Sequence, residues 1–275
     1  MQISRRELLI GAAGVAGAGA LGVELTRGGL PAGVPRRAPG PQLDGSFVSA
    51  ARGGARTGWA ISYPPNGTGT RLPVLLALHG RGEDHTDAFG TLHLDRFLAS
   101  AVAGGARPFV IASVDGGDHS YWHPRRGENA AAMVTDEFVP LLASHGLDVG
   151  RLGLLGWSMG GYGALYLAGQ LGAARCAVAI AESPAIWHEA AQSAPGAFDD
   201  AADFDANSVF GHLRRLRGMA LRIDCGASDG FAPVTRDLRA ALSPTPAGGI
   251  EPGGHDATYW RSQAAAQLNF ASERL

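Results

Sequence analysis

Short apolar runs alternate along this chain with longer stretches in which apolar residues recur at helical spacing. Polar residues barely interrupt each run, a pattern typical of parallel strands that are buried on both faces of a sheet. The runs are PVLLALHG (73–80), RPFVIASVDGG (107–117), RLGLLGWS (151–158), CAVAIAES (176–183) and ALRIDCG (220–226). We therefore expect a sheet with these five runs as its central strands.

Amphipathic stretches separate these runs and predict a helix after almost every strand. They are Thr86–Ala103, Glu128–His145, Met159–Leu171, Val209–Arg217, Pro233–Leu242 and Ala257–Ser272. Regular alternation of strand and helix predicts an α/β fold, a doubly wound and mostly parallel sheet with right-handed crossovers.

Polar clusters follow each predicted strand, and in such sheets ligands bind at the carboxyl ends of the strands. One edge of the sheet should therefore collect all of the chemistry that the chain carries. The clusters are His79-Gly80-Arg81, Asp115 to Trp122, Ser158, Glu182-Ser183 and Asp229.

Composition limits the number of domains and the class of partner. With 275 residues, of which 45% are hydrophobic, the chain can bury one sizeable core, so a single catalytic domain over 46–275 is expected. A net charge of −2 gives no electrostatic footprint for nucleic acid. Residues 26–45 are dense in Pro, Gly and Arg and lack apolar periodicity, which predicts a linker. An early strand is expected around Thr57–Tyr63.

The first 25 residues predict an export signal. Arg5 and Arg6 precede an uncharged, Gly/Ala-rich run from Leu8 to Val23, and this order resembles the twin-arginine signal. The competing interpretation is an uncleaved membrane anchor, although the run is shorter than the roughly 20 apolar residues that span a bilayer. We expect an exported protein (periplasmic, cell-wall or extracellular) that touches a membrane only through this segment.

Gly156, Ser158 and Gly160 form G-x-S-x-G between a predicted strand and a predicted helix. In that context the pattern is a nucleophile elbow, a tight turn that lifts a serine oxygen clear of the backbone. Ser158 is therefore the candidate nucleophile.

A serine nucleophile needs a base, and the base needs an acid that orients it. In this kind of fold the acid follows the serine along the chain, and the histidine base follows the acid. His255 lies in a Pro/Gly loop before the last helix and is the candidate base, in preference to His188 and His212. Asp229 lies in the loop after ALRIDC and is the favoured acid. Asp224, inside the strand, is the alternative and would otherwise be a structural carboxylate.

An oxyanion hole requires two preorganised backbone N–H groups. Met159 follows the nucleophile at a helix N-terminus and should supply one of them. Arg81 in LHGRGED should supply the other, with Gly82 as the fallback donor. His79 is expected to pack under that loop as a structural side chain.

The loop GGDHSYWHP holds the remaining candidates. Trp122 and Tyr121 either line the mouth of the substrate site or pack inside the domain. His119 and His123 lack the spacing of a metal site, so no metal is expected. Cys176 and Cys225 should remain unpaired, because neighbouring parallel strands would offset them by roughly 13 Å.

Five motifs, in this order, resemble those of the putative esterases, a branch of the α/β-hydrolases that includes esterase D and the antigen 85 mycolyltransferases. They are HGRGEDH, VDGGDHSYWHPR, GWSMGGYGALYLA, IDCGASDGF and GGHDATYW. The resemblance implies the α/β-hydrolase fold, a triad of Ser158, Asp229 and His255, oxyanion donors at Arg81 and Met159, and no cofactor. Relatives often carry Leu where this chain has Arg81. Pro184–Asn207 is the only candidate for a small lid.

The expected function is that of an exported serine carboxylesterase that acts on a small-molecule or lipid ester through an acyl-enzyme. An acyltransferase of the mycolyl type, in which an alcohol replaces water, has the same triad and stays an alternative. A noncatalytic binding or cell-wall protein is the second alternative. It is disfavoured because both Ser158 and His255 are present. The sequence leaves the oligomeric state open.

Overall fold

Eight strands pair into one sheet in the computed structural model, which describes residues 29–65, 67 and 71–275. Their order across the sheet is β1-β2-β4-β3-β7-β8-β9-β10. β2 is antiparallel to both of its neighbours, and from β4 to β10 all neighbouring strands are parallel. The strands span Gln42–Ser49 (β1), Ala55–Ser62 (β2), Pro73–Leu78 (β3), Val110–Val114 (β4), Asp148–Trp157 (β7), Cys176–Glu182 (β8), Ala220–Gly226 (β9) and Ile250–Glu251 (β10).

The five apolar runs form β3, β4, β7, β8 and β9, as the sequence predicts. A separate two-stranded hairpin consists of β5 (Pro124–Arg125) and β6 (Glu128–Asn129). The doubly wound, mostly parallel sheet flanked by helices is therefore confirmed.

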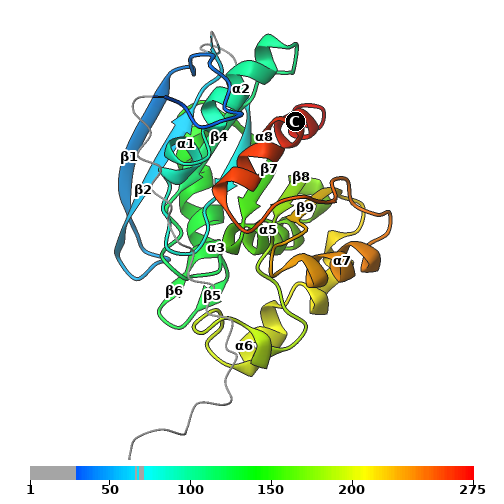
Figure 1. Cartoon of the computed structure of the whole chain (residues 1–275). Coiled ribbons are helices and arrows are strands. Elements are labelled where there is room, and N and C mark those ends of the chain that lie inside the picture. Colours follow the sequence, from blue (N-terminus) through cyan, green and yellow to red (C-terminus); the bar gives the residue numbers. More distant parts are fainter. Residues whose placement is uncertain (1–28, 66, 68–70) are drawn as a thin grey trace, which may run out of the picture.

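Helices cover both faces of the sheet (Figure 1). One apolar core lies between the sheet and α1, α2 and α8, and the other lies on the opposite face, where α5 packs on β7 and β8. The helices span Asp87–Gly90 (α1), Leu94–Ala103 (α2), Ala130–Ala132 (α3), Val139–Ser144 (α4), Met159–Arg175 (α5), Ala201–Asn207 (α6), Ala232–Ala241 (α7) and Ala257–Ser272 (α8). Three further turns are η1 (Met133–Phe138, π), η2 (Ala190–Gln192, 3-10) and η3 (Phe210–Leu216, 3-10).

Three predicted helices are less regular than their apolar spacing suggests. The stretch 86–103 breaks into α1 and α2 at His93, whose φ is 55°. In the stretch 128–145, the π-turn η1 comes immediately before α4. Pro140, near the start of α4, has no N–H to donate to an α-helical hydrogen bond. The stretch 209–217 is the 3-10 turn η3, interrupted at His212. The apolar periodicity thus predicts where these helical segments lie, but it does not predict where each one is interrupted.

The folded domain begins earlier than Ser46, so the predicted linker 26–45 is too long. β1 starts at Gln42, and Val34 is only 7% exposed in the core beside α1 and α2. The Tyr63 amide donates to the Pro41 carbonyl at 2.9 Å, so this Pro-rich stretch is held through its backbone. Such contacts leave no apolar periodicity in the sequence, which is why the segment resembles a tether.

The predicted export signal, residues 1–25, lies outside the described residues. Within the part of the chain that the structure describes, no helix is both long and apolar enough to cross a bilayer. Cys176 and Cys225 are both buried and unbridged, and burial raises the pKa of each thiol to about 12.

The docking of residues 29–41 predicts a difference between two matched substitutions. Val34→Thr places a hydroxyl in the core and should lower the free energy of unfolding by about 1–3 kcal/mol. Val48→Thr changes a side chain that is 72% exposed and keeps a β-branched residue in β1, so stability should change by less than about 0.5 kcal/mol. Denaturant unfolding measures both. Equal effects would mean that the segment around Val34 is a tether.

Candidate active site

Ser158 lies between the end of β7 and the start of α5 with φ 55° and ψ −117°, a conformation that non-glycine residues rarely adopt. Its amide donates to the Glu182 carbonyl at 2.9 Å, and its carbonyl accepts from the Ala185 amide at 3.0 Å. A Cβ on Gly160 would overlap the Leu78 carbonyl of β3, and a Cβ on Gly156 would overlap Gly160. The glycines of the motif therefore let the turn pack directly against the sheet.

His255 lies between Ser158 and Asp229 and contacts both. Its Nε2 is 2.9 Å from Ser158 Oγ, and its Nδ1 is 2.8 Å from Asp229 Oδ2. The Ser228 amide donates to the Gly253 carbonyl at 2.9 Å and so joins the loop of the acid to the loop of the base. The three side chains expected from the sequence thus form a hydrogen-bonded series in the order serine, histidine, aspartate.

The Asp229 carboxylate is built to stay ionised. Its side chain is fully buried, which alone would raise its pKa, but hydrogen bonds from His255 and from the Phe231 amide lower the pKa below the ordinary value. Because the pKa of Asp229 is lower in the folded than in the unfolded protein, ionisation of this carboxylate stabilises the fold. The stabilisation is present above the unfolded pKa of about 3.9 and is lost as the pH falls through the lowered folded pKa. An ionised acceptor keeps the proton on His255 Nδ1, which leaves Nε2 free to accept from Ser158.

Asp224 has a separate structural environment inside β9. Its buried carboxylate accepts from Arg222 at 2.7 and 3.0 Å and from Gln267 Nε2 at 3.1 Å. None of these bonds involves His255. The geometry therefore favours Asp229 over Asp224 as the partner of the histidine.

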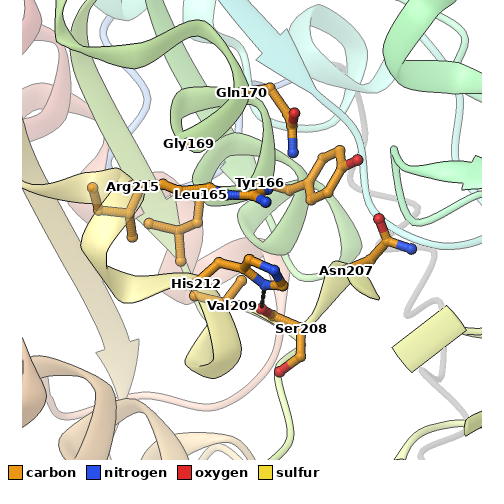
Figure 2. Close-up of a pocket in the computed structure, with 10 residues that line it drawn as sticks. Leu165, Tyr166, Gly169, Gln170, Asn207, Ser208, Val209, His212 and Arg215 are labelled. Atoms are coloured by element: carbon orange, nitrogen blue, oxygen red, sulfur yellow. Dashed lines mark hydrogen bonds between the residues drawn. The ribbon is translucent and has the colours of Figure 1, made fainter. Parts of the chain in front are cut away.

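The other two histidines after Ser158 lie elsewhere. His188 pairs with Asp237 at 3.0 Å on the surface. His212 Nδ1 contacts the Ser208 carbonyl at 2.9 Å beside a cavity between α5 and η3 (Figure 2). That cavity has a volume of about 20 Å³, room for about one water molecule and too little for a substrate.

Met159 directly follows the candidate nucleophile, and Arg81 lies in the loop after β3. The first residue of that loop, His79, packs with Leu78 against Gly160 of α5. Met159 is the first residue of α5, where helix amides have no intrahelical acceptor. Among the described residues, neither the Arg81 nor the Met159 amide has a hydrogen-bond acceptor, whereas the Gly82 amide donates to the Asp118 carbonyl at 2.9 Å. The fallback donor Gly82 is therefore already occupied, and Arg81 is the better candidate.

His79 sets the direction of the Arg81 amide. Its Nε2 accepts from the Gly116 amide at 2.9 Å, which assigns the proton to Nδ1, and Nδ1 donates to the Gly80 carbonyl at 2.7 Å. The Gly80 carbonyl and the Arg81 N–H belong to one trans peptide and point in opposite directions. The Arg81 N–H therefore points away from the buried His79 ring, which has the structural place expected from the sequence.

The possible substrate-lining residues Trp122 and Tyr121 do not form an exposed mouth but pack inside the domain, the second of the two alternatives that the sequence leaves open. They are 0% and 2% exposed. The Trp122 indole donates to the His79 carbonyl at 3.3 Å, and its ring occupies the space left by Gly116 and Gly163. Because the glycines leave this space free, the Trp122 ring packs inside the domain against the loop that contains His79.

Two aromatic rings contact the candidate base: buried Trp260, whose ring centroid lies 5.2 Å from that of His255, and Phe231, which also packs against Trp187. Sequence reasoning missed these aromatic contacts. The Phe231 ring centroid lies 5.4 Å from that of His255 and 5.7 Å from that of Trp187, and both side chains are partly exposed. Phe231 follows the candidate acid by two residues, and Trp187 lies in the predicted lid. Their positions beside those elements are the signal that could have identified them.

The candidate lid, 184–207, is fastened at its far end to the β5–β6 hairpin, beside which α6 lies in Figure 1. Arg125 Nε donates to Asp199 at 3.0 Å, and its NH1 donates to the Gly196 carbonyl at 2.8 Å. The Arg126 amide also donates to Asp199, at 2.7 Å. These bonds anchor the segment to the hairpin at Gly196 and Asp199.

Within the described ranges, no group of three or more His, Cys, Asp or Glu side chains is arranged to hold a metal ion. His123 is buried against Asp203 and Tyr121, and burial lowers its pKa below the ordinary value. The arrangement therefore consists of a candidate nucleophile, a candidate base, a candidate acid and two candidate oxyanion donors.

Comparison with known proteins identifies the family of the chain. The model of the Putative esterase family matches residues 50–271, so the chain belongs to that family and is an esterase-type enzyme. Among curated proteins, none matches the chain in sequence.

Solved structures share the fold at low sequence identity. A ferulic acid esterase matches with a TM-score of 0.71 at 19% identity, over 86% of this chain and 98% of its own. An S-formylglutathione hydrolase from Agrobacterium tumefaciens matches with a TM-score of 0.69 at 19% identity, over 85% and 95%. A substrate-bound fluorophosphonate-binding serine hydrolase of Staphylococcus aureus matches with a TM-score of 0.68 at 19% identity, over 86% and 98%. The α/β-hydrolase fold is thereby confirmed.

The two aspartates should respond differently to removal of their charge. Asp229→Asn should lower kcat by about 10⁴-fold, because the amide favours the wrong histidine tautomer, with little change in melting temperature. Asp224→Asn should lower the free energy of unfolding by about 1.5–3 kcal/mol, because it weakens charged hydrogen bonds to Arg222, while kcat of the folded enzyme stays close to that of the wild type. Kinetics and thermal unfolding of both variants measure this. The reverse pattern would give the role of the acid to Asp224.

Proposed function

We propose that this member of the Putative esterase family is an exported serine carboxylesterase in which Ser158 forms an acyl-enzyme. The observation that carries the proposal is the unbroken hydrogen-bonded series from Ser158 Oγ through His255 to Asp229. The amides of Arg81, in the loop after β3, and of Met159, at the start of α5, have no hydrogen-bond acceptor among the described residues and are the proposed oxyanion donors. The family and the fold of the structurally similar esterases support the same reaction class.

In the proposed acylation step, Ser158 Oγ attacks the ester carbonyl carbon while its proton moves to His255 Nε2. The carbonyl oxygen becomes an oxyanion and accepts hydrogen bonds from the amides of Met159 and Arg81. Collapse of this intermediate breaks the bond to the alcohol oxygen, which takes the proton from His255. Asp229 accepts from Nδ1 throughout and stabilises the transient imidazolium.

In the proposed deacylation step, water repeats the sequence. His255 removes a proton from the water, whose oxygen attacks the acyl carbonyl, and then returns the proton to Ser158 Oγ as the acid product leaves. An acceptor alcohol in place of water would give the transferase reaction through the same residues. The partner in either case is a small-molecule or lipid ester, and the partly exposed rings of Phe231 and Trp187 suit an apolar group on it.

Export through the twin-arginine route is the second part of the proposal. It is supported by Arg5 and Arg6 and by the weakly apolar run that follows them. The twin-arginine route carries folded proteins. It suits this domain because the candidate site forms only when loops far apart in the sequence have come together.

Substitution of the nucleophile and of the base tests the mechanism. Ser158→Ala and His255→Gln should each lower kcat for p-nitrophenyl butyrate by about 10⁴- to 10⁶-fold, because either change removes the activated nucleophile. A fluorophosphonate should label the wild type on Ser158 and leave Ser158→Ala unlabelled. The same assay with an added alcohol separates hydrolysis from acyl transfer by product analysis.

His188→Gln and His212→Gln are the matched controls, because both histidines have hydrogen-bond partners away from the site. Their kcat should stay within about twofold of the wild type. Wild-type turnover in Ser158→Ala would refute the mechanism, and loss of turnover in either control with an intact fold would reassign the base.

Export is tested by replacing Arg5 and Arg6 with lysine, which keeps the charge but removes both guanidinium groups. The double variant should accumulate in the cytoplasm, whereas the wild type should leave it. Continued export of the variant would contradict the twin-arginine route. A wild-type membrane pellet that resists salt but yields to detergent would instead indicate a retained anchor.

A further inference from the structure

Glu83 is a partly buried carboxylate beside the candidate site, and the reaction proposed above does not use it. One of its oxygens, Oε2, accepts from the Gly80 amide at 2.8 Å and from the Trp157 indole N–H at 2.5 Å. Gly80 belongs to the loop after β3, and Trp157 is the last residue of β7. A single carboxylate oxygen therefore bridges two neighbouring strand ends.

This bridge joins the two halves of the candidate oxyanion hole. Arg81, which follows Gly80, offers one free amide, and Met159, two residues after Trp157, offers the other. One N–H group comes from the loop after β3 and the other from the start of α5, and an oxyanion needs both within about 2.7–3.1 Å. The position of the loop after β3 relative to the end of β7 therefore determines the distance between the Arg81 and Met159 amides.

The backbone around Arg81 is held at three points. Glu83 holds the Gly80 amide, His79 Nδ1 holds the Gly80 carbonyl at 2.7 Å, and the Gly82 amide donates to the Asp118 carbonyl at 2.9 Å. The His79 contact lies within the loop, and His79 in turn accepts from the Gly116 amide, so the His79 and Asp118 contacts together fix the loop to the segment after β4. The contact through Glu83 is the one that reaches β7, the strand that carries the nucleophile.

We propose that Glu83 is a positioning residue that sets the distance between the Arg81 and Met159 amides by tying Gly80 to Trp157. The inference rests on the proposed function, since it assigns those amides to an oxyanion. Glu83 touches no reacting atom. Its effect should therefore appear in the stabilisation of the transition state, with little effect on binding of the ground-state ester.

The test compares Glu83→Met with Glu83→Gln in the full-length enzyme. Met keeps the length of the side chain but accepts neither bond, so kcat for p-nitrophenyl butyrate should fall by about 10- to 100-fold, part of the effect of losing an oxyanion donor. KM should stay within about twofold. Gln retains a carbonyl oxygen that can accept both bonds and should restore kcat to within about threefold of the wild type.

Glu137→Met is the matched control. Glu137 is also a partly buried carboxylate that bridges two donors, the Ser49 hydroxyl at 2.5 Å and the Ala51 amide at 2.9 Å, but it lies on η1 and contacts β1 and the turn that follows it. Its substitution should lower the melting temperature and leave kcat of the folded enzyme unchanged. A purely structural role of Glu83 would give the same result as this control.

A second readout is the affinity for a trifluoromethyl ketone, whose adduct with the serine places an oxyanion in the hole. The affinity should fall in Glu83→Met by the same factor as kcat and recover in Glu83→Gln. Should Glu83→Met fail to fold, Trp157→Phe removes the bridge from its other end and should lower kcat with KM unchanged.

The two proposals can fail separately. A wild type that neither hydrolyses esters nor reacts with a fluorophosphonate would refute the proposed function. An active wild type in which Glu83→Met keeps its kcat, or in which Glu83→Gln is as impaired as Glu83→Met, would overturn the positioning role alone.

Discussion

The backbone turn at Ser158 is the constraint on which the rest of the site depends. A positive φ at a serine costs about 1–3 kcal/mol, so the surrounding structure has to hold it. Two hydrogen bonds do so, from the Ser158 amide to Glu182 and from the Ala185 amide to Ser158, and Gly160 lets α5 approach β3 without a clash. The sheet thus supplies the rigidity that a strained turn requires.

Other strain lies at the same edge of the sheet. Of the non-glycine residues with positive φ in the described part of the chain, Tyr121, Trp122, Ser158 and Ser183 all follow central strands at their carboxyl ends, whereas His93 lies between α1 and α2. Tyr121 and Trp122 lie under the loop that carries Arg81. Strain concentrated at one edge, and offset by packing elsewhere, is typical of a preorganised site.

Much of this arrangement could be predicted from the sequence, because it follows from strand order and short motifs. Uninterrupted apolar runs located the central strands, the parallel sheet then placed Ser158 and Asp229 at one edge, and the order acid and then histidine indicated His255. Contacts that leave no periodic pattern could not be predicted: the docking of Val34 was missed, and the sequence could not decide between a place at the mouth and the burial of Trp122 in space left by glycines. Phe231, Trp187 and Glu83 were missed for the same reason, since their roles depend on neighbours far away in the sequence.

Detection of the acyl-enzyme is the most direct measurement of the central claim, that the Ser158–His255–Asp229 series performs nucleophilic catalysis. Enzyme quenched in acid during turnover of p-nitrophenyl butyrate, then digested and analysed by mass spectrometry, should carry one butyryl group on the peptide that contains Ser158. The adduct should accumulate when deacylation is slower than acylation. Rapid turnover with an adduct on another residue would contradict the account.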